Sequence, residues 1–439
     1  MGGRSTYLIH GFVMEHAGSC DLRLRNERPL RMIPFSPPRI DDLTIKAVEE
    51  ALRSGWITTG PRTKEFEKRI AAYCGVRHAI ALNSWTNACE LVLRWYGIGP
   101  GDEVIVPAYT YCATANIVLH VGARPVMVDV LDDFTMDPMA VKRVLTNRTK
   151  AIIPVDIGGL PARIKEIMRV AEEGCGLFTP KVNLRVDGSN PQMRLGRALV
   201  ISDAAHSFGA SVGGQRTGAQ ADITGFSFHA VKNLTTAEGG ALTFNLPEPF
   251  DNAELYRFFN LLSLHGQSKD ALAKTQPGAW RYDVSIAGWK CNMTDLQAAI
   301  GLVELDRFDT ETTPRRKAIC ERYDMAFRGD PRLVPPSFKE GDRESCYHLY
   351  MLRLANATED QRDAVIAAIA KREVSVNVHF IPLPKLSLYE GLGYRMVDHP
   401  NTYRLYSTEI SLPVYYDLSD AQVDTVVAAV KAAVTEVLG

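Results

Sequence analysis

Short apolar runs alternate with amphipathic stretches through the middle of the chain. Between residues 78 and about 245, helical candidates such as 86–95 and 161–173 separate most of the β-rich runs. The runs are 79–82, 104–106, 126–128, 151–155, 198–201 and 223–228. Apolar strands that alternate with helices are typical of a largely parallel sheet covered on both faces. The pattern therefore predicts a large α/β domain.

The flanking segments follow other patterns. Before the sheet, residues 43–52 have apolar side chains on one face, which predicts a helix. A capping box at Thr294 predicts a long helix that closes the large domain. After about residue 315 the pattern becomes α+β. It predicts strands over 346–354 and 374–380, and helices over 359–371 and from Ser419 onward.

These patterns divide the chain into three parts. We expect an N-terminal extension over residues 1–32, a large α/β domain over 33–314 and a small α+β domain over 315–439. Residues 174–197 break the strand–helix rhythm, and we interpret them as an insertion at the surface of the large domain.

Composition narrows the class of protein. The 439 residues are 46% apolar, and 50 Lys and Arg face 51 Asp and Glu, which gives a net charge of −1. This balance lacks the basic excess expected of a protein that binds nucleic acid or an anionic membrane. No apolar run approaches the length of a membrane span, and no secretory signal is evident. The eight cysteines form no CxxC pair, so no metal site is predicted and the thiols are expected to be reduced, as in the cytoplasm.

The strongest chemical signal is Lys232. It lies in the segment Gly225-Phe-Ser-Phe-His-Ala-Val-Lys-Asn-Leu-Thr-Thr-Ala-Glu-Gly-Gly240, after an apolar strand. A lysine held there can lose its charge by desolvation and attack a carbonyl carbon. A surface lysine before a hairpin is the alternative interpretation of this segment alone.

A second signal is Asp203, in Val200-Ile-Ser-Asp-Ala-Ala-His206. Because it follows an apolar strand, it is expected at the carboxyl end of the sheet, where open α/β folds bind ligands. A carboxylate there can keep a heteroaromatic nitrogen protonated. Taken alone, Asp203 could equally cap a helix and His206 could be a packed core residue.

The third signal is Leu82-Asn-Ser-Trp-Thr-Asn-Ala88, between a strand and a helix. Free N–H groups at a helix start, together with the hydroxyls of Ser84 and Thr86, suit a phosphate group. Ser and Thr also cap helices generally, so the segment is weak evidence by itself. Together, however, the three signals supply a phosphate cradle, a partner for a pyridine nitrogen and a Schiff-base lysine, which are the parts of a pyridoxal phosphate site.

From about Ile33 to Val437 the sequence resembles the DegT/DnrJ/EryC1/StrS family of pyridoxal-phosphate-dependent sugar aminotransferases. The matching stretches are Ser54-Gly-Trp-Ile-Thr-Thr-Gly-Pro61, Gly97-Ile-Gly-Pro-Gly-Asp-Glu-Val104, Asp203-Ala-Ala-His206, Ser227-Phe-His-Ala-Val-Lys232, Glu238-Gly-Gly240 and Met293-Thr-Asp-Leu-Gln-Ala-Ala299. The resemblance implies the fold-type-I architecture. It is nearest to the branch that aminates nucleotide-linked 4-keto sugars, as in amino-arabinose synthesis.

The resemblance also implies roles for single residues. Lys232 would form the Schiff base with the cofactor and act as the catalytic group. The other cofactor contacts would be Asp203 at the pyridine nitrogen, His206 at the phenolic oxygen, Tyr111 stacked on the ring, and Trp85, Thr86 and Ser227 at the phosphate. Lys290 would reach the phosphate from the partner subunit of a homodimer, and His379 would lie near the sugar.

Three features depart from the family pattern. Asp156 replaces the usual histidine after the Ile-Pro-Val strand, which makes it a candidate substrate contact. Trp85 is bulky for a phosphate loop, and the insertion at 174–197 lacks a counterpart in familiar members. Each departure affects the expected sugar more than the expected cofactor.

The resemblance implies a ping-pong reaction through Schiff bases, with glutamate as the expected amino donor. Three other functions are weighed against it. A sugar dehydratase on this fold would carry histidine in place of Lys232. Amination of a cyclitol or another non-nucleotide ketone stays open, and a non-catalytic binding protein would not need the intact lysine and aspartate.

Overall fold

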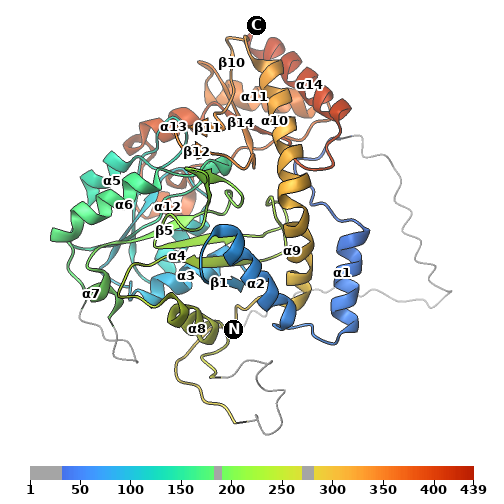
Figure 1. The fold of residues 1–439 in the computed structure, drawn as a ribbon. Helices are drawn as coiled ribbons and strands as arrows, with labels where there is room; N and C mark the ends of the chain where they lie inside the picture. Colours follow the sequence, from blue (N-terminus) through green and yellow to red (C-terminus); the bar gives the residue numbers. More distant parts are fainter. Residues whose placement is uncertain (1–31, 182–189, 269–280) are drawn as a thin grey trace, which may run out of the picture. The chain divides into compact units, whose positions relative to one another are not determined.

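A computed structural model describes residues 32–181, 190–268 and 281–439 (Figure 1). The predicted N-terminal extension, apart from residue 32, and residues 182–189 of the predicted insertion lie outside the described residues. The rest of that insertion contains a short turn of helix at 174–176 and the helix α7 (Pro191–Leu195).

Seven strands form the central sheet, in the order β1-β9-β8-β5-β4-β2-β3. Their bounds are β1 (Ala79–Leu82), β2 (Glu103–Pro107), β3 (Arg124–Val128), β4 (Thr149–Ile152), β5 (Leu199–Asp203), β8 (Ile223–Ser227) and β9 (Gly240–Phe244). Neighbours from β3 to β8 are parallel, whereas β9 is antiparallel to both β8 and β1. The predicted α/β class with a mostly parallel sheet is confirmed. The strand β9 is an addition to the predicted set.

Helices cover both faces because side chains along each strand alternate in direction. In β2, Val104 and Val106 pack in one buried cluster, whereas Ile105 packs in another. The first cluster includes α3 (Trp85–Trp95), α4 (Ala113–His120) and α8 (Asn252–Ser263). The second includes α5 (Pro138–Val144) and α6 (Ile164–Glu173), which lie together at the edge of Figure 1.

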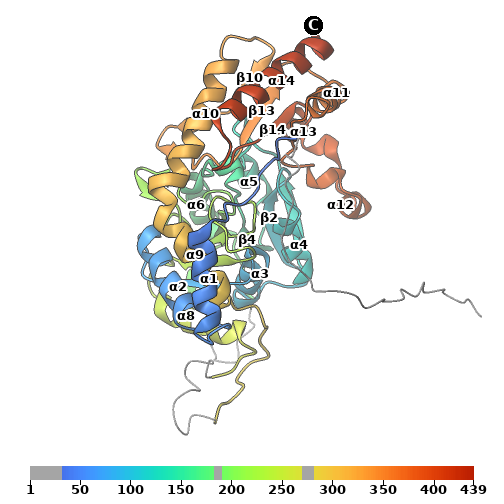
Figure 2. The ribbon, with the colours of Figure 1, turned by 90° about the vertical axis from the view of Figure 1, so that its right-hand side faces the viewer.

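A second, smaller sheet lies toward the C-terminus. It consists of β10 (Leu333–Val334), β13 (Tyr350–Leu354) and β14 (Glu409–Leu412). It shares a buried cluster with α10 (Thr313–Phe327), α11 (Glu359–Ala370) and α14 (Asp420–Leu438), which gather beside it in Figure 2. Two short helices, α12 (Ser387–Gly391) and α13 (Pro400–Tyr406), precede β14. The short strands β6 (Ser211–Val212), β7 (Gln215–Arg216), β11 (Lys339–Glu340) and β12 (Arg343–Glu344) pair separately.

One helical run joins the regions of the two sheets. The helix α9 (Asp295–Arg307) continues through a π-helical turn at Phe308–Thr312 into α10. The predicted domain boundary at residues 314 and 315 therefore falls inside a helix, and the division into two domains stays a prediction. No helix in the described ranges has the length and apolar character to cross a membrane.

The predicted strand at 374–380 is wrong. This segment makes only isolated bridges, between Ile33 and Val374 and between Asn377 and Ser411. The main-chain N–H of His379 donates to the carboxylate of Glu409 at 3.0 Å instead of to a strand carbonyl. The sequence does alternate, but beyond the bridge at Asn377 the Glu409 side chain accepts the amide hydrogen bond that a strand carbonyl would otherwise accept.

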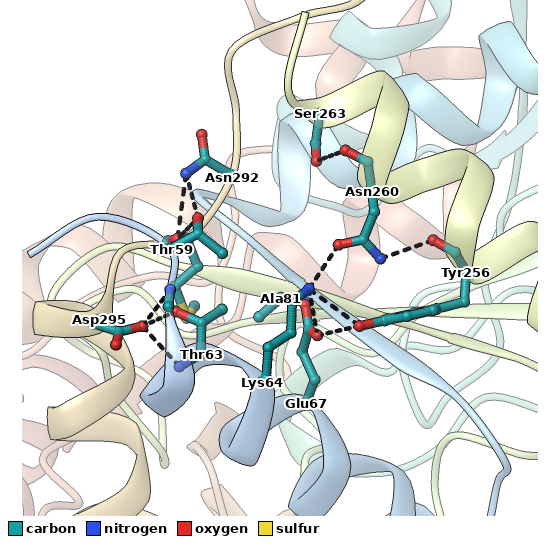
Figure 3. A network of polar contacts seen from close by, with 12 residues as sticks. Thr59, Thr63, Lys64, Glu67, Ala81, Tyr256, Asn260, Ser263, Asn292 and Asp295 are labelled. Carbon is teal, nitrogen blue, oxygen red and sulfur yellow. Dashed lines mark hydrogen bonds and ion pairs between the residues drawn. The ribbon is translucent and has the colours of Figure 1, made fainter. Parts of the chain in front are cut away.

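Two buried carboxylates join α2 (Pro61–Cys74) to its surroundings (Figure 3). Glu67 accepts hydrogen bonds from the main-chain N–H of Ala81 on the edge strand β1, from the Tyr256 hydroxyl and from the Lys64 ammonium. It thereby satisfies an amide and links α2, β1 and α8. Burial of Glu67 raises its pKa above the usual range.

Asp295 holds the start of α2 from the neighbouring helix α9. Its carboxylate accepts from the N–H groups of Gly60, Arg62 and Thr63, at 2.8, 3.1 and 2.9 Å, and from the Thr63 hydroxyl at 2.7 Å. These amides have no helical partner of their own, and a negative charge is favourable at a helix N-terminus. Asp295 is fully buried, so it caps α2 and fixes the preceding turn at the same time.

We expect Asp295→Ala to lower the free energy of unfolding by about 3 kcal/mol, because it leaves two buried amides and one partly buried amide without an acceptor. Asp306→Ala is the matched control. Asp306 also lies on α9 and also bonds α2, through Arg69 at 2.6 Å, but that pair is exposed and should contribute at most about 1 kcal/mol. Urea unfolding followed by circular dichroism measures both. Equal losses in the two variants would contradict the capping role.

Candidate active site

A cavity of about 460 Å³ lies at the carboxyl ends of β5 and β8. Its walls come from segments far apart in the sequence: the start of α3, the chain after β2, the ends of β5 and β8, and two C-terminal segments. Its polar and aromatic lining includes Ser84, Thr86, Tyr111, Thr114, Asp203, His206, Ser227, Lys232, His348, His379 and Phe380. Parallel strands deliver their C-terminal residues to one edge, which is why these residues meet.

Asp203 is the last residue of β5 and is buried. One carboxylate oxygen accepts from the Thr114 hydroxyl at 2.9 Å, and the other accepts from the Ala205 N–H at 3.2 Å. Burial raises the pKa of Asp203 to about 7, although these bonds and the charge of Lys232 oppose the rise. Asp203 forms no ion pair with the residues that the structure describes. It is therefore a carboxylate suited to receiving a cationic partner from the cavity.

Lys232 lies in the turn after β8, where its N–H donates to the His229 carbonyl at 2.9 Å. Burial lowers the pKa of its ammonium to about 8, while the Asp203 carboxylate acts in the opposite direction. A substantial fraction of Lys232 is therefore neutral near physiological pH, as a nucleophile requires.

The next residue fixes this turn. The Asn233 side-chain amide donates to the Cys346 carbonyl at 2.9 Å, and its oxygen accepts from Nδ1 of His348 at 2.7 Å. The lysine-bearing loop is thus tied to the C-terminal wall of the cavity.

The start of α3 provides donors for an anion. The Ser84 hydroxyl caps the helix by accepting from the Asn87 N–H at 3.1 Å. The N–H groups of Trp85 and Thr86 have no acceptor among the described residues and lie at the cavity wall. The strand β9 approaches them closely, since a Cβ on Gly240 would lie 2.5 Å from the Trp85 nitrogen. Only glycine allows this approach.

The bulk of Trp85 does not obstruct this cradle. Its side chain is 5% exposed and packs in the core beneath the sheet. A Cβ on Gly225 of β8 would lie 2.9 Å from its indole nitrogen, so Gly225 makes room for the ring. The unusual tryptophan therefore presents its backbone, rather than its side chain, as the donor at the helix start.

Three histidines line the opposite wall. Nδ1 of His206 accepts from the Gly158 N–H at 3.3 Å, so the proton of the neutral ring lies on Nε2. Burial lowers the pKa of His206 well below its usual value, and its ring lies 4.4 Å from that of His348. The ring of His379 lies 6.5 Å from His206 and stacks on Phe35 at 5.4 Å.

Eight of the ten predicted site residues line this cavity. They are Trp85, Thr86, Tyr111, Asp203, His206, Ser227, Lys232 and His379. Ser227 ends β8 beside the α3 cradle, and the ring of Tyr111 lies 5.6 Å from that of Phe380. Their individual roles toward a cofactor stay predictions.

Two predicted residues lie elsewhere. Asp156 is buried beneath the wall, where its carboxylate accepts from the Ala162 N–H at 2.7 Å and the Ser207 hydroxyl at 2.5 Å. Both of its oxygens accept hydrogen bonds from the protein and it is absent from the cavity lining, so a contact with the substrate stays a prediction. Lys290 is exposed outside the cavity of its own chain and donates to the Asn292 side chain.

The lining residues that the sequence prediction missed include Phe35, Thr114, His348 and Phe380. Thr114 is three residues after Tyr111, so its place at the first turn of α4 was accessible from the motif. Nothing local marks the other three, because His348 and Phe380 reach the cavity through the packing of the C-terminal segments, and Phe35 reaches it from the chain before α1.

These residues fit pyridoxal phosphate. Asp203 lacks a cation among the described residues, and a protonated ring nitrogen would supply one. The unpaired amides at α3 and the hydroxyls of Thr86 and Ser227 match a phosphate group. Lys232 lies at the same cavity with a lowered pKa, as attack on the cofactor aldehyde requires.

Comparison with known proteins supports this assignment. The DegT/DnrJ/EryC1/StrS aminotransferase family matches residues 38–177 and 196–431, which leaves out most of the predicted insertion. The spore coat polysaccharide biosynthesis protein SpsC of Bacillus subtilis is 38% identical over 404 residues, covering 91% of this chain and 96% of SpsC.

Solved structures agree in fold. A candidate sugar aminotransferase, Spr1654 from Streptococcus pneumoniae, has a TM-score of 0.87 in its PMP form, with 45% identity over 92% of this chain and all of its own. The PLP form of the same protein has a TM-score of 0.86 and 43% sequence identity. PseC of Helicobacter pylori, an aminotransferase of pseudoaminic acid biosynthesis, gives 0.79 and 26% identity over 92% of this chain. The chain belongs to the DegT/DnrJ/EryC1/StrS family of pyridoxal-phosphate-dependent, fold-type-I aminotransferases.

Proposed function

We propose that this enzyme moves an amino group from glutamate to a keto sugar, and that the sugar is a nucleotide-linked 4-keto sugar. The observation that carries the proposal is the meeting of Lys232, Asp203 and the α3 donors in one cavity. The names of SpsC, Spr1654 and PseC support a carbohydrate substrate. The volume of about 460 Å³ lies within the range of roughly 300–1,000 Å³ typical of small-molecule sites.

Pyridoxal phosphate, when bound, supplies an electron sink for the carbon that exchanges its amino group. The amides of Trp85 and Thr86 and the hydroxyl of Ser227 would anchor the phosphate. The Asp203 carboxylate would hold a proton on the ring nitrogen, and the bond from Thr114 keeps that carboxylate oriented. His206, protonated on Nε2, would donate to the phenolic oxygen.

Lys232 moves the proton. Once its amine is free, Nζ can take a proton from the donor carbon and return one later, and its pKa of about 8 suits both directions. Burial keeps water from competing for that proton. The two half-reactions, with glutamate and with the sugar, would use the same lysine and the same cavity in turn.

We propose a homodimer in which Lys290 serves the partner's cavity. Lys290 is exposed and lies away from the cavity of its own chain, beside the partly exposed Trp289. Ile57, in the turn held by Asp295, is 52% exposed, as expected of a residue that packs against a second subunit.

A cytoplasmic location completes the proposal. The seven cysteines in the described ranges are free thiols, of which five are buried. Reduced thiols without disulfides are typical of that compartment.

We expect the wild-type enzyme to transfer nitrogen from glutamate to one member of a panel of nucleotide-linked 3-keto and 4-keto sugars, with keto-cyclitols as comparison substrates. Lys232→Ala should abolish transfer while keeping the fold, because no other lysine among the described residues lines the cavity. Mass spectrometry of the aminated product measures this. Retained transfer in the variant would contradict the catalytic role of Lys232. Transfer only to cyclitols would contradict the proposal that the substrate is a keto sugar.

The rate at which the cofactor-free enzyme captures pyridoxal phosphate should rise with pH through about 8, because the neutral form of Lys232 is the nucleophile. In Asp203→Asn the midpoint should fall below that value, since the carboxylate that favours the ammonium is gone. Stopped-flow absorbance follows the yellow adduct. An unmoved midpoint would show that the two groups are not coupled.

Mixed dimers test Lys290. Lys232→Ala should be inactive alone and Lys290→Ala only weakly active, but a dimer of one of each contains one complete site. Random exchange of subunits should therefore restore about a quarter of the sites. Activity that stays at the mean of the two parents would place Lys290 outside the partner's site.

A further inference from the structure

A buried chain of hydrogen bonds lies behind His379. Nδ1 of His379 and the Ser411 hydroxyl are 2.9 Å apart, and the Ser411 hydroxyl bonds Oε1 of Glu409 at 2.5 Å. The second oxygen of Glu409 accepts the main-chain N–H of His379 at 3.0 Å. Glu409 and Ser411 both lie on β14 and are fully buried. The three residues form a closed unit with His379 at its cavity end.

Glu409 has no ion-pair partner among the described residues. The nearest cation is Arg362 on α11, which donates to the main-chain carbonyl of Glu409 at 3.1 Å and to that of Tyr406 at 2.7 Å. Its Nε pairs with Asp363. The other titratable group facing Glu409 is the buried Tyr109, whose pKa is raised first by burial and then by this carboxylate. Burial raises the pKa of Glu409 itself to about 8.

His379 stays a neutral ring. Burial lowers its pKa to about 3, and the positive charge of Lys232 contributes to the decrease. The other titratable groups around it, His206 and His348, are also neutral, since burial lowers both of their pKa values well below the usual range. Nδ1 of His379 is engaged by Ser411, so Nε2 is the nitrogen left for a group in the cavity.

The chain has two arrangements that differ by one proton. When Glu409 is ionised, Ser411 donates to Oε1, Nδ1–H donates to Ser411, and Nε2 is a bare acceptor. When Glu409 is protonated, Oε1–H donates to Ser411, Ser411 donates to Nδ1, and Nε2 carries the hydrogen. Since Oε2 is held as an acceptor by the N–H of His379, the added proton belongs on Oε1. The ring changes from acceptor to donor without gaining charge.

We propose that Glu409 and Ser411 are positioning residues that let His379 recognise both the ketone of the substrate and the amine of the product. A ketone oxygen only accepts hydrogen bonds, so it would meet Nε2–H. An ammonium group only donates, so it would meet bare Nε2, with the proton released from Glu409. This inference rests on the proposed function and deepens it, because it assigns the group that faces the reacting carbon of the sugar.

The first test needs no sugar. In the full-length enzyme with bound cofactor and ¹⁵N-labelled histidine, the signal of His379, identified by its loss in His379→Gln, reports which nitrogen is protonated. We expect Nε2–H about two pH units below the pKa of Glu409 and Nδ1–H about two units above it. Ser411→Ala and Glu409→Gln should each lose the change, and Ser411→Thr should keep it. A single tautomer across the range in the wild type would overturn the proposal.

The second test measures binding to forms of the enzyme that cannot react. A UDP-linked 4-keto hexose is titrated into the pyridoxal form, and its 4-amino counterpart into the pyridoxamine form. A glutamine at 409 mimics the protonated acid, so Glu409→Gln should bind the ketone as the wild type does and the amine about tenfold more weakly. Ser407→Ala, which removes another buried hydroxyl near β14, should change neither affinity.

The outcomes are separable. Equal changes for ketone and amine in Glu409→Gln would assign Glu409 a structural role and overturn the proposal. If the wild type shows the tautomer change but binds neither sugar, the coupling of Glu409, Ser411 and His379 is supported and the proposed substrate is refuted.

Discussion

A buried carboxylate and a partly buried lysine that share one cavity impose the main constraint on this molecule. Asp203 and Lys232 both lose hydration, and neither forms an ion pair within the described ranges; their charges act on each other across the cavity. Such an arrangement is costly unless other groups hold each side chain in place. Thr114 and the Ala205 amide do this for Asp203, while Asn233 fixes the turn that carries Lys232. The surrounding fold keeps these two desolvated groups positioned for a cofactor.

Much of the fold and the centre of the site could be predicted from the sequence. The strand ends at Asp203 and Ser227 and the helix start at Thr86 are local features, and a parallel sheet brings them together by its topology. The strand β9 is absent from the predicted set, because Gly240-Ala-Leu-Thr-Phe244 is a short run directly after the segment that carries the lysine. The alternation at 374–380 predicts a strand, because no local pattern reveals that the Glu409 carboxylate accepts the hydrogen bond of the His379 amide.

The outer wall of the site could not be predicted in the same way. His348, Phe380 and Phe35 reach the cavity only when the smaller sheet and the chain before α1 pack against the large sheet, and their neighbours in the sequence carry no sign of this. Asp156 shows the reverse case. Its place where the family usually carries histidine predicts a substrate contact, which stays a prediction; in the structure its oxygens accept hydrogen bonds from Ala162 and Ser207, and it is absent from the cavity lining.

The residues that line the cavity are spread over most of the described sequence, from Phe35 to Phe380. During synthesis, Lys232 is therefore made before the C-terminal residues that enclose it in the cavity. In such a nascent chain the Lys232 amine, which reacts with aldehydes, would be exposed to bulk water, and other amines could compete with it for the coenzyme. Enclosure comes only once residues 348–380 have been made, so that a product terminated before them would keep the reactive lysine and lose part of the cavity wall.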